Sequence, residues 1–315
     1  MRAVYVVAVA AIMMATPTAG AAEMDQPIVG DWGGLRQLRH PVEASGASYH
    51  ADATSIHRIA IAQAKPVSGR IEGRFNYSTL DDEAFGNEID GTSWTLRGSV
   101  NLSAAAFNLQ VDGSAKHVSR EGLEGSSLGG TAHAYYRPVG GRYAAGVFAS
   151  TTRLRDGTGT LASLGMGSEA TDVIGGAEIA ALTRAATFYA RAGAGGASHE
   201  GFDADRLHLA IGSRFFVGTS LRFDLEGTVD RTSTALGDAD LYSFKAVANY
   251  RPEGRNYSLF GGVRRDHARV ETAAGFGQGV SMNSYFAGAR LHFGDHGFRA
   301  QDRGGALWEA IDPLP

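Results

Sequence analysis

The segment from Leu221 to Asp230 alternates strictly between apolar and charged or small residues. Successive side chains of a β-strand point to opposite faces, so this pattern predicts a strand with one apolar and one charged face. A soluble sheet buries its apolar face, whereas a membrane barrel turns that face to lipid and its charged face to the lumen. The apolar positions are Leu221, Phe223, Leu225 and Val229, and the charged ones are Arg222, Asp224, Glu226 and Asp230.

The same alternation recurs about a dozen times along the chain. Each segment has roughly the 9 to 11 residues that a tilted strand needs to cross a bilayer. A two-residue period of this length does not fit a helix. We therefore expect an all-β fold, a closed antiparallel transmembrane β-barrel of about 12 strands. The predicted strands are 69–79, 92–102, 106–117, 127–137, 142–152, 171–181, 185–195, 205–216, 219–230, 240–250, 256–266 and 283–293.

The connections between these segments alternate between short and long. The short ones carry Gly or Pro, as in Pro138–Gly141 and Pro252–Gly254, which favours tight turns. The long ones are polar and rich in Gly, Ser and Asp, as in 153–170 and 267–282. Outer-membrane barrels have short periplasmic turns and long extracellular loops. This parity predicts that both ends of the barrel sequence lie in the periplasm.

The segments outside the barrel have separate predictions. An apolar run from Val4 to Ala15, followed by Ala19-Gly20-Ala21, predicts a secretory signal peptide over residues 1–21. Residues 22–68 are expected to form a short N-terminal segment, in the periplasm or as a plug of the lumen. If part of it forms a hairpin, the strand count rises to 14. Residues 69–293 are the predicted barrel, and 294–315 a C-terminal extension in the periplasm.

The amino-acid composition limits which partners, covalent sites and activities the protein can have. A net charge of −4 and a pI near 6.2 argue against nucleic acid as a partner. The chain has no cysteine, which excludes disulfides, thiolate metal sites and cysteine lipidation. It also has no His-Glu-x-x-His motif. We therefore expect no enzymatic activity, no cofactor and no metal site.

Over most of residues 69–293 the chain resembles Gram-negative outer-membrane porin-like barrels. In addition, Gly30-Asp31-Trp32-Gly33-Gly34-Leu35-Arg36 resembles the segment that opens mature carbohydrate-selective porins. The resemblance implies a location in the cell outer membrane and a transport function. It also implies as partners the outer-membrane lipid and lipopolysaccharide, the barrel-assembly machinery and small hydrophilic solutes. Assembly into homo-oligomers is left open.

The inward-facing positions predict how such a channel would work. Basic residues on five strands that become consecutive on closure oppose acidic residues from the other side, which would set a transverse field across the pore. The expected function is passive diffusion of small hydrophilic solutes or ions. One alternative is a structural or adhesive barrel with a plugged lumen. Another is a lipid-modifying hydrolase, although His133 and His208 are expected to face inward. The predicted pore-lining residues are Arg74, Arg97, Asp112, Glu178, Arg191, Asp224, Glu226, Lys245, Arg264 and Arg290.

Overall fold

A computed structural model of the chain describes residues 67–82, 87–120, 123–157, 169–199, 202–235, 237–272, 277–294 and 297–311. The predicted signal peptide, the Gly30–Arg36 segment and nearly all of the predicted N-terminal segment lie outside these residues. Within them, no helix is long and apolar enough to span a membrane.

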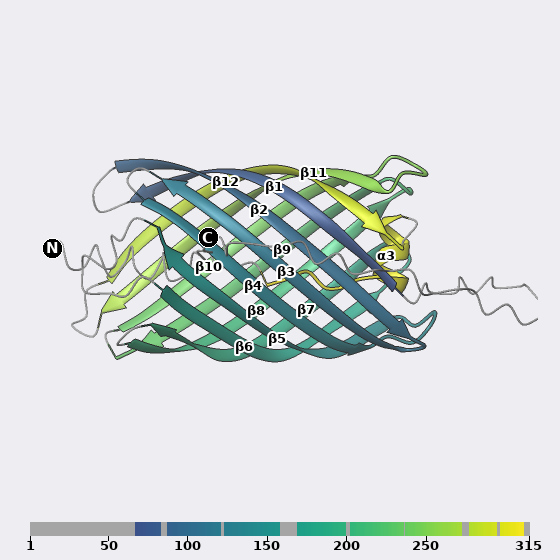
Figure 1. The fold of residues 1–315 in the computed structure, drawn as a ribbon, viewed down its shortest axis with the longest axis horizontal. Helices are drawn as coiled ribbons and strands as arrows, with labels where there is room; N and C mark the ends of the chain where they lie inside the picture. The colour runs from purple at the N-terminus through teal and green to yellow at the C-terminus, as the bar shows by residue number, and fades with distance from the viewer. Residues whose placement is uncertain are drawn as a thin grey trace, which may run out of the picture. The chain divides into compact units, whose positions relative to one another are not determined.

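The described chain forms twelve antiparallel strands that close into a barrel, because β1 pairs with both β2 and β12 (Figure 1). This closure confirms the predicted fold and the count of twelve, and leaves no place in the sheet for the alternative of fourteen. One short helix, α3 (Phe298–Gly304), follows the last strand. The strands are β1 (Val67–Asp82), β2 (Asn87–Ala104), β3 (Phe107–Arg120), β4 (Leu123–Tyr136), β5 (Tyr143–Asp156), β6 (Glu169–Leu182), β7 (Ala186–His199), β8 (Phe202–Val217), β9 (Leu221–Thr234), β10 (Gly237–Tyr250), β11 (Tyr257–Thr272) and β12 (Gly277–Phe293).

All twelve predicted strands are present, but most extend further at the end with the long loops. β11 continues to Thr272 rather than 266, and β12 begins at Gly277 rather than 283. The apolar alternation stops where contact with lipid stops, whereas backbone pairing between neighbouring strands needs no lipid. Sequence periodicity therefore locates the membrane-crossing part of each strand and misses its extension beyond the bilayer.

The turns at the opposite end are short and built as the sequence predicts. The Gly141 N–H donates to the Pro138 carbonyl over 2.8 Å, and the Arg255 N–H to the Pro252 carbonyl over 3.1 Å. These bonds close four-residue β-turns. Gly140 and Gly254 occupy the third position of these turns with φ of 71°, a left-handed conformation that glycine adopts without steric cost.

Burial in this barrel is inverted relative to a soluble protein. Large apolar side chains stand exposed on the outer face, such as Ile211 at 60% and Phe75 at 57%. Polar side chains are buried inside, such as Gln110 at 0% and Arg222 at 1%. A continuous exposed apolar surface of this kind is stable only against an apolar solvent. The protein is therefore a membrane-spanning β-barrel of the outer-membrane type.

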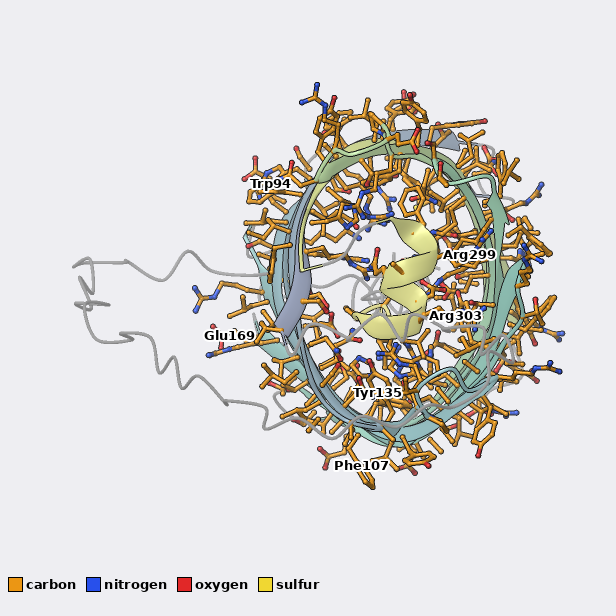
Figure 2. The ribbon with its side chains drawn as sticks, turned by 90° about the vertical axis from the view of Figure 1, so that its right-hand side faces the viewer. Trp94, Phe107, Tyr135, Glu169, Arg299 and Arg303 are labelled. Atoms are coloured by element: carbon orange, nitrogen blue, oxygen red, sulfur yellow. The ribbon has the colours of Figure 1, made fainter. Side chains whose placement is uncertain are left out.

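The C-terminal extension does not lie outside the barrel as expected. Residues 297–311, called the tail below, fold back into the lumen, and α3 lies within the ring of strands (Figure 2). Phe298, Leu307 and Trp308 are each only 1% exposed. The reason is chemical complementarity, since the tail carries apolar side chains and carboxylates that the basic interior can bury.

Candidate pore and the tail inside it

All ten predicted pore-lining residues lie on the inner face of the barrel, and they fall into two groups. Five of them are partly exposed to the lumen and five are buried against neighbouring groups. The partly exposed residues are Arg74, Arg97, Glu226, Lys245 and Arg264, and the buried ones are Asp112, Glu178, Arg191, Asp224 and Arg290.

The basic residues occupy consecutive strands, as the sequence predicts. Lys245, Arg264, Arg290, Arg74 and Arg97 lie on β10, β11, β12, β1 and β2, in the order in which these strands pair. Several of them are neutralised within the wall. Lys245 Nζ lies 2.7 Å from a Glu226 oxygen, and Arg290 Nε lies 2.6 Å from a Glu72 oxygen. The interior is thus a network of ion pairs more than two separate walls of opposite charge.

On the acidic side, His133 joins two carboxylates. Its Nε2 lies 3.0 Å from an Asp112 oxygen and its Nδ1 3.0 Å from a Glu178 oxygen. Arg191 approaches the same Glu178 carboxylate at 3.6 Å. His133 and His208 both point inward as predicted, and His208 is paired with Asp230 at 2.9 Å. These histidines stabilise buried carboxylates inside the barrel and do not face the lipid.

The tail enters the lumen at the end with the short turns. The Arg137 guanidinium, just after β4, donates to the carbonyls of Asp302 at 3.1 Å and Gly305 at 3.0 Å. Arg303 donates to the carbonyl of Thr183 in the turn between β6 and β7. In the predicted topology this is the periplasmic end. α3 therefore lies across that opening of the barrel.

Asp302 is the main anchor of α3. Its side chain is fully buried, and its two carboxylate oxygens each lie 3.2 Å from Nη1 of Arg214. The same nitrogen also donates to the Leu307 carbonyl at 2.6 Å. Arg222 adds a longer contact to Asp302 at 3.9 Å and lies 4.9 Å from the ring centre of Phe298. Two arginines on β8 and β9 thereby fix the helix through one carboxylate.

Trp308 is the apolar anchor deeper in the lumen. Its ring stacks near His133, with centroids 6.5 Å apart, and meets Tyr135 edge-on at 6.0 Å. Its backbone is held from both sides by the Gln110 side-chain amide, which donates to the Trp308 carbonyl at 2.7 Å and accepts from its N–H at 3.1 Å. Leu307 completes a small core with residues of β4, β5 and β6.

Glu309 and Ile311 continue the tail along the lumen. The Glu309 carboxylate lies 3.7 Å from Arg222 and 3.8 Å from Arg70, and the Glu309 carbonyl accepts from Arg191 at 2.8 Å. Burial alone would raise the pKa of Glu309, but the surrounding arginines, Arg70 foremost, hold that pKa well below its usual range. Glu309 is therefore a charged partner of the basic interior.

One cavity beside Ala310 and Ile311 has a volume of about 20 Å³ and is lined by His208, Asp230, Lys245 and Arg264 among others. That volume holds roughly one water molecule. With the tail in place, this cavity is too small for a hydrated solute.

Sequence reasoning missed most of the residues that bind the tail. Arg191, a predicted pore-lining residue, donates to the Glu309 carbonyl. The other residues that hold the tail are not among the ten predicted ones, namely Arg70, Gln110, Arg137, Arg214 and Arg222. The available signal was the tail itself, which carries Phe298 and Trp308 together with the carboxylates of Asp302 and Glu309. Such a composition is unusual for a solvated extension.

No family model and no curated protein matches the sequence. Solved structures with a similar barrel include an outer-membrane channel from Pseudomonas putida F1, at 14% identity and a TM-score of 0.49, covering 74% of this chain and 98% of that one. The β domain of the Bordetella autotransporter BrkA has 13% identity and a TM-score of 0.46, covering 72% and 100%. An anion-selective porin from Comamonas acidovorans has 10% identity and a TM-score of 0.36, covering 72% and 98%.

Proposed function

We propose that this protein is a porin-like channel of the outer membrane for passive diffusion of small hydrophilic solutes or ions, closed in the present conformation by its own tail. The observation that carries this proposal is the barrel itself, which is closed, apolar outside and charged inside. Among the described residues, the hydrogen bonds between tail and wall all involve a side chain. The tail can therefore leave without breaking the strand pairing.

The environment of the barrel follows from its surface. The exposed apolar belt fits outer-membrane lipid, with lipopolysaccharide on the extracellular side, and insertion by the barrel-assembly machinery. Export through a cleaved signal peptide is part of the same proposal. Nucleic acid is not expected as a partner.

A second candidate is a structural or adhesive barrel that stays plugged. It is favoured by the deep burial of Trp308 and Asp302 and by the small volume left beside the tail. A lipid-modifying hydrolase gains less support, because such an enzyme needs a base that opens toward the bilayer. His133 and His208 instead contact carboxylates inside the barrel.

Single-channel recording in planar bilayers separates the first two candidates. We compare the refolded full chain with the variant Asp302→Asn/Glu309→Gln, which removes both carboxylates that hold the tail. Asp238→Asn is the matched control, because Asp238 pairs with Arg231 at an exposed strand end. The channel proposal predicts stepwise conductance that is much more frequent in the double variant than in the full chain and the control. Silence of a double variant whose barrel is folded, shown by heat-modifiable gel migration, would favour the plugged barrel.

A further inference from the structure

The arginines that hold the tail are arranged as a receptor for carboxylates. We propose that Arg214 and Arg222, with Arg70, form a binding site for small solutes that carry two or more carboxylates, and that the tail fills this site with Asp302 and Glu309 until such a solute replaces them. This inference rests on the proposed channel function, because it assumes that solutes reach the lumen.

The first half of the site is built around Arg214. Arg214 as a whole residue is 2% exposed, and its guanidinium binds both carboxylate oxygens of Asp302 at 3.2 Å. The wall itself holds this side chain in place, since the Arg214 guanidinium lies 5.1 Å from the ring centre of Tyr189. Tyr189 is fixed in turn by a 2.8 Å hydrogen bond to Glu226. The guanidinium therefore stays positioned for a carboxylate when Asp302 leaves.

The second half of the site is Arg222, which contacts two carboxylates at once. One of its terminal nitrogens lies 3.9 Å from Asp302, and the other lies 3.7 Å from Glu309. Asp224 in the wall holds the same guanidinium at 2.8 Å. Two carboxylates that share one guanidinium must lie close together in space. The site therefore matches a compact solute whose carboxylates are separated by only a few bonds.

The charge of a solute determines whether it can replace the tail in this site. In the described residues, the ion pair of Arg214 is with Asp302, so withdrawal of the tail leaves this guanidinium without that counter-ion. Cationic side chains gathered on one wall of a narrow passage attract anions, which favours a site filled by carboxylates over an empty one. Arginine pairs with carboxylate through charge-assisted hydrogen bonds that a neutral sugar cannot replace. A carboxylated solute therefore promotes undocking, and a neutral solute of similar size does not.

The test measures undocking in the full chain through a single engineered cysteine. Ala306→Cys replaces a side chain that is 1% exposed, in a protein without native cysteine. Its rate of reaction with a water-soluble maleimide then reports the fraction of undocked tail. Citrate is the probe, with sodium chloride at matched ionic strength and sorbitol as controls. We expect citrate at ten times its dissociation constant to speed labelling about tenfold, with saturation, and neither control to do so.

The variant Arg214→Gln in the same background identifies the site. It should raise the basal labelling rate and remove most of the response to citrate, whereas Arg231→Gln at an exposed strand end should leave both unchanged. If the cysteine variant fails to fold, the emission of Trp308 serves instead, in a full chain with Trp32→Phe and Trp94→Phe. A saturable red shift with citrate supports the site. No response to citrate by either readout, or a response that Arg214→Gln leaves intact, would overturn it.

Conductance distinguishes failure of the site from failure of the proposed channel. If Asp302→Asn/Glu309→Gln conducts potassium chloride while citrate neither blocks the current nor speeds labelling, the channel stands and the carboxylate site is wrong. If citrate speeds labelling through Arg214 but no variant conducts, the site stands and the protein is not a channel.

Discussion

Replacing Asp302 by Asn tests how the tail is held, because the change removes a charge and keeps the shape of the side chain. Asp302 is fully buried and lies 3.2 Å from Arg214 and 3.9 Å from Arg222. Removing one partner of a buried ion pair costs about 3 to 5 kcal/mol. Asn keeps an oxygen that accepts a hydrogen bond, and Arg214 keeps its bond to the Leu307 carbonyl at 2.6 Å. We therefore expect Asp302→Asn to cost an amount at the low end of this range, about 3 kcal/mol of docking free energy.

This loss predicts a rise of roughly two orders of magnitude in the undocked population, since each ~1.4 kcal/mol is a factor of ten. The assay is the maleimide labelling rate of the Ala306→Cys chain with and without Asp302→Asn. A double-mutant cycle with Arg214→Gln should show a combined effect smaller than the sum of the two single effects, because both changes remove the same ion pair. Asp238→Asn, which breaks an exposed pair with Arg231, should change the rate little. Equal labelling rates with and without the Asp302→Asn change would show that this ion pair does not hold the tail.

Four further predictions concern the barrel, its orientation and the tail. Leu209→Arg, on the exposed apolar belt, should cost ~2 to 4 kcal/mol of unfolding free energy in lipid, whereas Thr219→Arg in a short turn should cost under ~1 kcal/mol; equal costs in urea titrations would contradict the lipid assignment. Epitope tags inserted next to Gly157 or Gly237 should be accessible on intact cells and a tag next to Gly140 should not, and surface labelling at Gly140 would reverse the topology. Replacing Arg97 and Arg264 together with Glu should move the reversal potential of the open channel toward cations at low salt, where screening is weak, and an unchanged potential would place them away from the narrowest point. Because the pKa of Glu309 is lowered on docking, its contribution to docking is present above the ordinary carboxylate range and is lost only as pH falls through the lowered value. The labelling rate of Ala306→Cys, divided by the rate of a freely exposed cysteine at the same pH because only the thiolate reacts, should therefore be unchanged between pH 8 and pH 5, and a rise of this ratio at pH 6 would contradict a charged Glu309.

The barrel could be predicted from the sequence because its determinants are local and repeated. The alternation that puts Leu225 outside and Asp224 inside is a property of a few adjacent residues, and twelve repeats of it leave few other folds. Pro-x-Gly turns at Pro138 and Pro252 set the short connections in the same local way. The inward direction of the ten predicted pore residues follows from the same period.

The position of the tail could not be predicted in this way. Its docking depends on Arg70, Arg214 and Arg222 converging on Asp302 and Glu309, and these arginines lie far from the tail along the chain. α3 has only seven residues, too few to show a helical period. The predicted opposition of basic and acidic walls was also incomplete, because cross-strand partners such as Glu72 for Arg290 and Glu226 for Lys245 neutralise much of the basic arc.

If the barrel is a channel closed by its own tail, holding the tail outside its site must open it, and one bilayer recording tests this. The full chain carrying Ala306→Cys is reconstituted in a planar bilayer and exposed to a maleimide linked to polyethylene glycol. A modified residue 306 cannot return to a site that is 1% exposed, so each reaction traps the tail outside its site. A quiet bilayer should then gain persistent conductance steps, one for each modified molecule, and the chain without the cysteine should stay quiet. A folded barrel that is fully modified at residue 306 and still carries no current would contradict the channel proposal.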